Sequence, residues 1–80
     1  MSAQPLSRQY DIVSQDYDRA GEASASIKQA LRQLGIGADI LRRVSVAAYE
    51  AEMNLVIHSL GGTLSLLVDR DAIILTAQDL

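Results

Sequence analysis

Hydrophobic residues recur at every third or fourth position in two stretches of the chain, which is the spacing of an amphipathic helix. The first stretch covers residues 19–34 and predicts a helix with one apolar face, followed by Gly35 as a C-terminal cap. The second covers residues 39–59 and is apolar around most of its circumference, which predicts a helix buried on more than one side. Asp39 is expected to cap the start of this second helix.

Strand-like segments flank the two helices. Residues rich in Leu, Ile, Val, Tyr and Thr predict strands at 8–17, 63–68 and 72–78. The last two strands are expected to form a hairpin, with Asp69-Arg70-Asp71 as its turn. The Gly61-Gly62 pair is expected to end the second helix.

The order of these elements predicts the fold class. Strand, helix, helix, strand, strand is typical of an α+β domain, a two-layer sandwich in which the helices pack on one face of a small sheet. The chain has 80 residues, enough for one domain. Residues 1–7, which include the only proline, are predicted to be a disordered N-terminus, and residues 8–80 to form the domain.

Composition narrows the classes of function. The net charge is −3 and no basic stripe is visible, which disfavours direct binding of nucleic acid. The absence of cysteine excludes disulfides and thiolate metal sites. No apolar run is long enough for a membrane span and no signal peptide is visible, so a cytoplasmic protein without a membrane partner is expected.

A polar stripe interrupts the second helix. Glu50 and Asn54 lie about 40° apart on a helix and share one face, with Arg43 and His58 on nearly the same line. If they were buried without partners, a carboxylate and an amide would each cost a few kcal/mol. Two interpretations stay open: the pair lines a cavity that holds a ligand, or Glu50 is exposed and a loop carbonyl satisfies Asn54.

The ligand interpretation has a chemical rationale. An amide oxygen is a hard ligand that suits Mg²⁺ bridging to phosphates. A carboxylate one turn away can orient or deprotonate the group that attacks a phosphate. Glu52, about 160° from Glu50, is expected to face solvent or to form a salt bridge between helices. His58 is interpreted as a helix-end residue and Arg42-Arg43 as a solvated helix start.

The residues around this stripe resemble a known family. The segment Tyr49-Glu50-Ala51-Glu52-Met53-Asn54, followed by His58 and by Gly61-Gly62, is similar to bacterial anti-sigma regulatory factors. The segments Ala20–Ser24 and Arg42-Arg43 extend the resemblance, which covers about residues 18–79. Members of this family are serine/threonine protein kinases with the ATP-binding fold of histidine kinases and DNA gyrase, the Bergerat fold.

The resemblance implies a cofactor, partners and roles for three residues. Asn54 matches the residue that binds Mg²⁺, and Glu50 matches the acidic residue that assists phosphoryl transfer. Asp79 stands where the family has an Asp that binds the adenine amino group. The implied cofactor is ATP with Mg²⁺, and the implied partners are a sigma factor and an anti-sigma factor antagonist. The fold is then the N-terminal part of a Bergerat domain.

The sequence departs from the family after Asp79. The family's glycine motifs, its lid over the phosphates and its last strands do not follow in these residues. An alternative hypothesis is therefore a non-catalytic interaction module derived from such a kinase. Without those last strands an open sheet edge is expected, and such an edge favours pairing into a homodimer.

Overall fold

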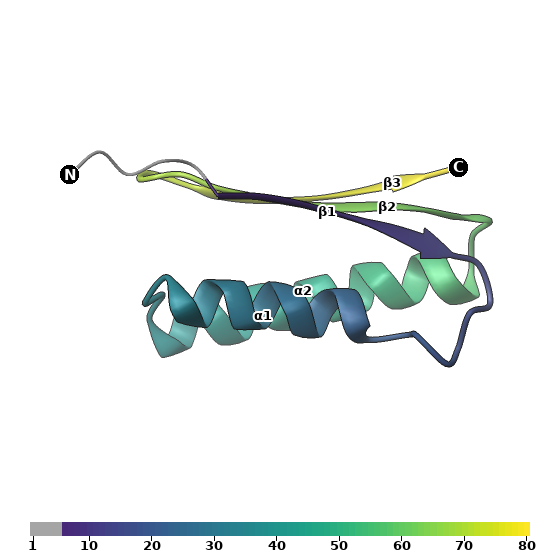
Figure 1. The fold of residues 1–80 in the computed structure, drawn as a ribbon, viewed down its shortest axis with the longest axis horizontal. Helices are drawn as coiled ribbons and strands as arrows, with labels where there is room; N and C mark the ends of the chain where they lie inside the picture. The colour runs from purple at the N-terminus through teal and green to yellow at the C-terminus, as the bar shows by residue number, and fades with distance from the viewer. Residues whose placement is uncertain (1–5) are drawn as a thin grey trace.

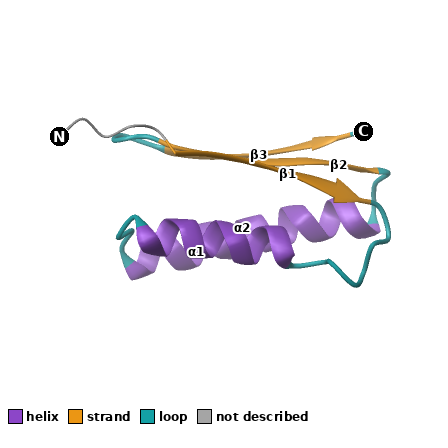
Figure 2. Cartoon of the chain, in the orientation of Figure 1, coloured by secondary structure: helices purple, strands orange, loops and turns teal. Residues whose placement is uncertain are grey.

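The computed structural model describes residues 6–80 and has two layers, a sheet above and a pair of helices below (Figure 2). The elements follow in the predicted order: β1 (Leu6–Val13), α1 (Glu22–Gln33), α2 (Ala38–Ile57), β2 (Gly61–Val68) and β3 (Ile73–Asp79). Both helices cover the same face of the sheet (Figure 1). The predicted α+β class with a two-layer arrangement is thus confirmed.

The sheet has three antiparallel strands in the order β1-β2-β3, so the two ends of the chain supply the edges. Along β2, Leu64, Leu66 and Val68 are buried while their neighbours are more exposed. This alternation follows from the two-residue period of a strand that is covered on one face. The register places Asp79 opposite Gly62 and Leu75 opposite Leu66, on the face that packs on the helices.

The core lies between the sheet and one side of each helix. The fully buried side chains of α1, Ile27 and Leu31, pack in one cluster with Leu55 of α2 and with Leu64 and Leu66 of β2. Burying a Leu or Ile side chain contributes roughly 1.5–3 kcal/mol, so this cluster holds the two layers together.

The end of α1 has the predicted glycine. Gly35 has a φ of 78° and follows the C-cap residue Leu34. The Gly35 N–H donates to the Arg32 carbonyl at 3.0 Å, and the Ile36 N–H donates to the Leu31 carbonyl at 3.2 Å. This pair of bonds is a Schellman motif, which needs the left-handed conformation that glycine adopts without strain.

The start of α2 differs from prediction, and its environment agrees only in part. Gly37 is the N-cap residue and no side chain caps the helix; Asp39 lies in the first turn, where it pairs with Arg42 at 3.3 Å and Arg43 at 3.6 Å. The expectation of burial on more than one side is met by the contacts with α1 and the sheet, but a third side of α2 stays exposed. Ile40, Val46, Tyr49 and Ile57 are 46–53% exposed, because only the sheet and α1 cover this helix in the described residues.

The boundaries of the strands also differ. β1 begins at Leu6 and ends at Val13, whereas residues 8–17 were predicted. Disorder was predicted for residues 1–7, but Leu6 and Ser7 belong to β1; residues 1–5 lie outside the described residues. Residues after Val13 turn away from the sheet, with Gln15 at a φ of 62° and its N–H donating to the Val56 carbonyl at 2.8 Å. Gly61 and Gly62, expected to end α2, begin β2 instead.

The hairpin between β2 and β3 matches its prediction. The Asp69 carboxylate accepts hydrogen bonds from the N–H groups of Asp71 and Ala72, both at 2.8 Å. An aspartate that accepts bonds from amides two and three residues ahead is a common way to close a turn. Within residues 6–80, neither helix has the length and apolar character needed to cross a membrane.

Candidate functional site

The helical geometry of α2 places Glu50 and Glu52 on different sides of the helix. Ala48, Glu52, Leu55 and Val56 are its buried residues and form one side of the helix. Two residues on a helix correspond to about 200° of rotation, so Glu50 projects away from the buried side. Asn54, two residues after Glu52, also projects away from the buried side. Glu50 and Asn54 are both exposed.

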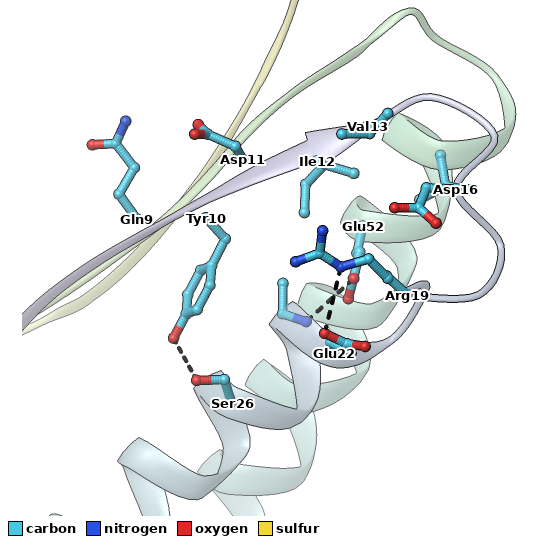
Figure 3. Close-up of a pocket in the computed structure, with 12 residues that line it drawn as sticks. Gln9, Tyr10, Asp11, Ile12, Val13, Asp16, Arg19, Glu22, Ser26 and Glu52 are labelled. Carbon is cyan, nitrogen blue, oxygen red and sulfur yellow. Dashed lines mark hydrogen bonds and ion pairs between the residues drawn. The ribbon is translucent and has the colours of Figure 1, made fainter.

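Glu52, expected to face solvent or a salt bridge, is instead 2% exposed and binds the start of α1 (Figure 3). One carboxylate oxygen accepts hydrogen bonds from the N–H groups of Gly21 at 3.0 Å and Ala23 at 3.3 Å. The other accepts one from the Ser24 N–H at 2.8 Å. The carboxylate therefore caps α1 from a different helix, in a position that also suits the positive end of the α1 dipole.

A sequence signal for this role was available. The N-cap position of α1 holds Gly21, which has no side chain to accept the free N–H groups of the first turn. Those groups need an acceptor from elsewhere in the fold. Glu52 is four residues after Ala48 and four before Val56, so it belongs to the apolar side of α2 rather than to its polar stripe.

A cavity of about 430 Å³ lies beside this carboxylate, between β1, the loop after it and the start of α1. Its wall includes Glu52 and the pair formed by the Tyr10 hydroxyl and the Ser26 hydroxyl, 2.8 Å apart (Figure 3). Glu50, Asn54 and Asp79 do not line this cavity. The cavity and the sequence-predicted residues therefore belong to different parts of the molecule.

The predicted stripe forms the flank of α2 that faces away from α1. Because the Glu52 carboxylate contacts α1, the positions about 200° from it point to the opposite side. Glu50 and Asn54 lie there, and within residues 6–80 neither side chain makes a hydrogen bond. Arg43, exposed on the same side, pairs with Asp39.

His58 and Asp79 lie at the same end of the molecule as Asn54. His58 is the C-cap residue of α2, and its N–H donates to the Asn54 carbonyl at 2.9 Å. β3 ends at Asp79, above the C-terminal end of α2 (Figure 1). Since Asp79 pairs in register with Gly62, its side chain belongs to the helix-facing side of the edge strand.

Asn54 is the amide at this end of the molecule that could contribute to a metal site. Among residues 6–80 no three His, Cys, Asp or Glu side chains gather in a way that could hold a metal without help. A single amide such as Asn54 provides one hard oxygen, and Mg²⁺ commonly takes only one or two protein ligands beside waters and phosphates. Asn54 is exposed at this end and could supply one such oxygen.

Comparison with known proteins gave no match of any kind: no protein-family model, no curated protein and no solved structure is similar to this chain.

Proposed function

We propose that this chain is the Mg²⁺-ATP-binding part of an anti-sigma regulatory factor of the serine/threonine-kinase type, with a Bergerat fold. The observation that carries the proposal is the uncovered flank of α2, from which Glu50 and Asn54 both project, one turn apart. Asp79 stands at the same end of the molecule, on the helix-facing side of β3.

In this proposal, a residue of α2 binds the magnesium ion and a residue of β3 binds the adenine. The Asn54 amide oxygen would bind Mg²⁺, and the Asp79 carboxylate would accept a hydrogen bond from the adenine amino group. Both side chains are exposed, so neither has to break a hydrogen bond within the described residues before it binds. A bound Mg²⁺-ATP supplies the phosphoryl group and the charge neutralisation that its transfer needs.

Glu50 has the position of a general base in this proposal. It is one turn before Asn54, so the rigid backbone of α2 fixes its carboxylate relative to the proposed magnesium ligand. A carboxylate in that place can accept the proton of a serine hydroxyl as the hydroxyl attacks the γ-phosphate. The acceptor protein would be an anti-sigma factor antagonist, and the regulated partner a sigma factor.

Mg²⁺-ATP is expected to stabilise the protein, and Asn54→Ala is expected to remove about half of that effect or more. A ligand at a hundredfold excess over its dissociation constant raises the free energy of unfolding by about 2.7 kcal/mol. Losing the magnesium ligand should weaken binding by about tenfold or more, which corresponds to about 1.4 kcal/mol. Thermal denaturation with increasing Mg²⁺-ATP measures both effects.

Gln29→Ala is the matched control, because Gln29 is also an exposed amide on a helix but lies on α1. It should leave the response to Mg²⁺-ATP unchanged. Without ligand, both variants should unfold within about 0.5 kcal/mol of the wild type, as exposed substitutions usually do. The absence of any response of the wild-type protein at millimolar Mg²⁺-ATP would remove the proposed function.

A non-catalytic interaction module is the second candidate, and the exposed apolar side chains favour it. Four large apolar residues of α2 are 46–53% exposed. Such residues are typical of surfaces that contact another protein when they form a contiguous patch. If the protein is such a module, it binds its partner protein but does not respond to Mg²⁺-ATP.

A homodimer is expected under both candidates, formed through the open edge of β3. Within residues 6–80, β3 pairs only with β2, so one edge of β3 has free backbone groups that can pair with a second chain. Ile74→Lys places a charge on this edge strand and is expected to give a monomer. Size-exclusion chromatography with light scattering measures both species; a well-folded wild-type monomer would contradict the expectation.

A further inference from the structure

A second surface lies along the two helices, and only these helices and Gly21 line it. This α1–α2 groove has a volume of about 660 Å³ and contains no strand residue. Its lining comes from one side of each helix: Gly21, Ser24, Ala25, Lys28, Arg32, Ala38, Leu41, Arg42, Ser45, Val46 and Tyr49. It includes none of the residues proposed to bind nucleotide, so its role is independent of that function.

The groove has the dimensions of a helix-binding site. From Ala38 to Tyr49 it follows α2 for twelve residues, a rise of about 16 Å, which is three helical turns. Small residues, among them Ala25 and Ser45, line its middle. Small side chains let a further helix approach to the interaxial distance of about 8–10 Å that is usual for packed helices.

The charge of the groove is opposite to that of the protein. The chain has ten acidic residues and a net charge of −3, yet no carboxylate lines the groove. Three of its seven basic residues, Lys28, Arg32 and Arg42, do. Within residues 6–80, Lys28 and Arg32 form no ion pair, and they lie four apart on α1, where like charges repel each other.

Apolar side chains occupy the other end of the groove. Val46 and Tyr49 are each 53% exposed and follow Arg42 at helical spacing. The basic residues Arg32 and Arg42 lie near the turn between the helices, whereas Tyr49 lies beside the start of α1. The groove thus presents a basic end and an apolar end to the same ligand.

We propose that the α1–α2 groove binds an acidic amphipathic helix of a partner protein. The apolar face of that helix would cover Val46 and Tyr49, and its carboxylates would pair with Lys28 and Arg32; Arg42 already pairs with Asp39. Carboxylates placed there relieve the repulsion between the basic side chains, and anchors at helical spacing suit a helix lying in a groove. The acidic balance of the whole protein disfavours a nucleic acid at the same place.

Selection from a random peptide library tests the chemistry of the ligand. A displayed library of about 16 residues, long enough for the three turns of the groove, is selected on the wild-type protein. Enriched peptides are expected to combine Asp or Glu with apolar residues at helical spacing. An enriched peptide is then synthesised and its dissociation constant measured by fluorescence anisotropy. Enrichment of basic or uncharged sequences, or no enrichment, would overturn the proposal.

Two pairs of variants locate the binding site. Arg32→Glu should weaken the peptide by about tenfold or more through like-charge repulsion. Arg70→Glu makes the same charge change in the exposed hairpin turn and should change the affinity by less than about twofold. Val46→Asp should abolish binding, whereas Leu60→Asp alters an exposed apolar residue outside the groove, between α2 and β2, and should not.

Thermal denaturation of the four variants checks that each is folded, since all four positions are exposed. Equal loss of binding in a variant and its control would place the peptide elsewhere and overturn the proposal. Sedimentation of the protein without peptide tests whether a second copy of this chain occupies the groove. A dimer that Arg32→Glu dissociates would show that the groove holds a second copy of this chain, which also overturns it.

Discussion

Glu52→Ala is expected to lower the free energy of unfolding by about 3–5 kcal/mol. The buried carboxylate accepts three backbone hydrogen bonds from the first turn of α1. Removing it leaves those N–H groups without an acceptor and leaves a void between the helices. For a domain of this size the melting temperature should fall by at least about 12 °C. Urea denaturation and thermal denaturation followed by circular dichroism measure the two quantities.

The same helix provides the control for this experiment. Glu50→Ala removes the same side chain two residues earlier, where it is exposed and makes no hydrogen bond within the described residues. It should change the free energy of unfolding by less than about 0.5 kcal/mol. Glu52→Gln keeps the size of the side chain but turns an amide donor toward N–H groups, and an intermediate loss is expected. If both Ala variants lose the same stability, the capping role of Glu52 is wrong.

The second large effect is expected at the start of β2, where Gly61→Ala and Gly62→Ala should each cost about 2–4 kcal/mol. Gly61 has a φ of 93°, and a Cβ there would lie 2.5 Å from the backbone oxygen of Ile12. A Cβ on Gly62 would collide with the carbonyl oxygen of Gln78 on the neighbouring strand. Neither oxygen can move unless its strand moves, so both variants should separate β2 from a neighbour.

Gly37→Ala is the comparison for the glycine variants. Gly37 has a φ of −60°, and no atom lies within 4 Å of the position that a Cβ would take. A side chain there meets no obstacle, and the change in the free energy of unfolding should stay within about 1 kcal/mol. Urea denaturation of the three variants gives the comparison directly. Wild-type stability of Gly61→Ala would show that the strand start is less tightly packed than described.

The helices and strands were largely predictable because their signals are local. Ile27 and Leu31 lie on the apolar face predicted for α1 and are fully buried. Gly35 adopts the left-handed conformation expected of a residue that follows a helix. Asp69 closes the hairpin where the turn was predicted. Each of these depends on residues that are close in sequence, so periodicity and turn chemistry were sufficient.

The candidate site was only partly predictable. The shared face of Glu50 and Asn54 follows from helix geometry alone, and the structure has both on one flank of α2. Whether that flank is covered depends on what packs against α2, which periodicity does not report. The apolar character of residues 39–59 therefore overstated the burial of the helix, and Val46 and Tyr49 proved to be exposed.

The sequence by itself determined the order of the elements, the apolar faces of α1 and the sheet, and the shared flank of Glu50 and Asn54, because local backbone geometry fixes each of them. Only the tertiary structure decided which glutamate of α2 is buried. Glu52 is enclosed because the uncapped start of α1 lies beside it and donates three N–H groups. An acceptor supplied by one helix to another, 28 to 31 residues away along the chain, exists only once the two helices have packed.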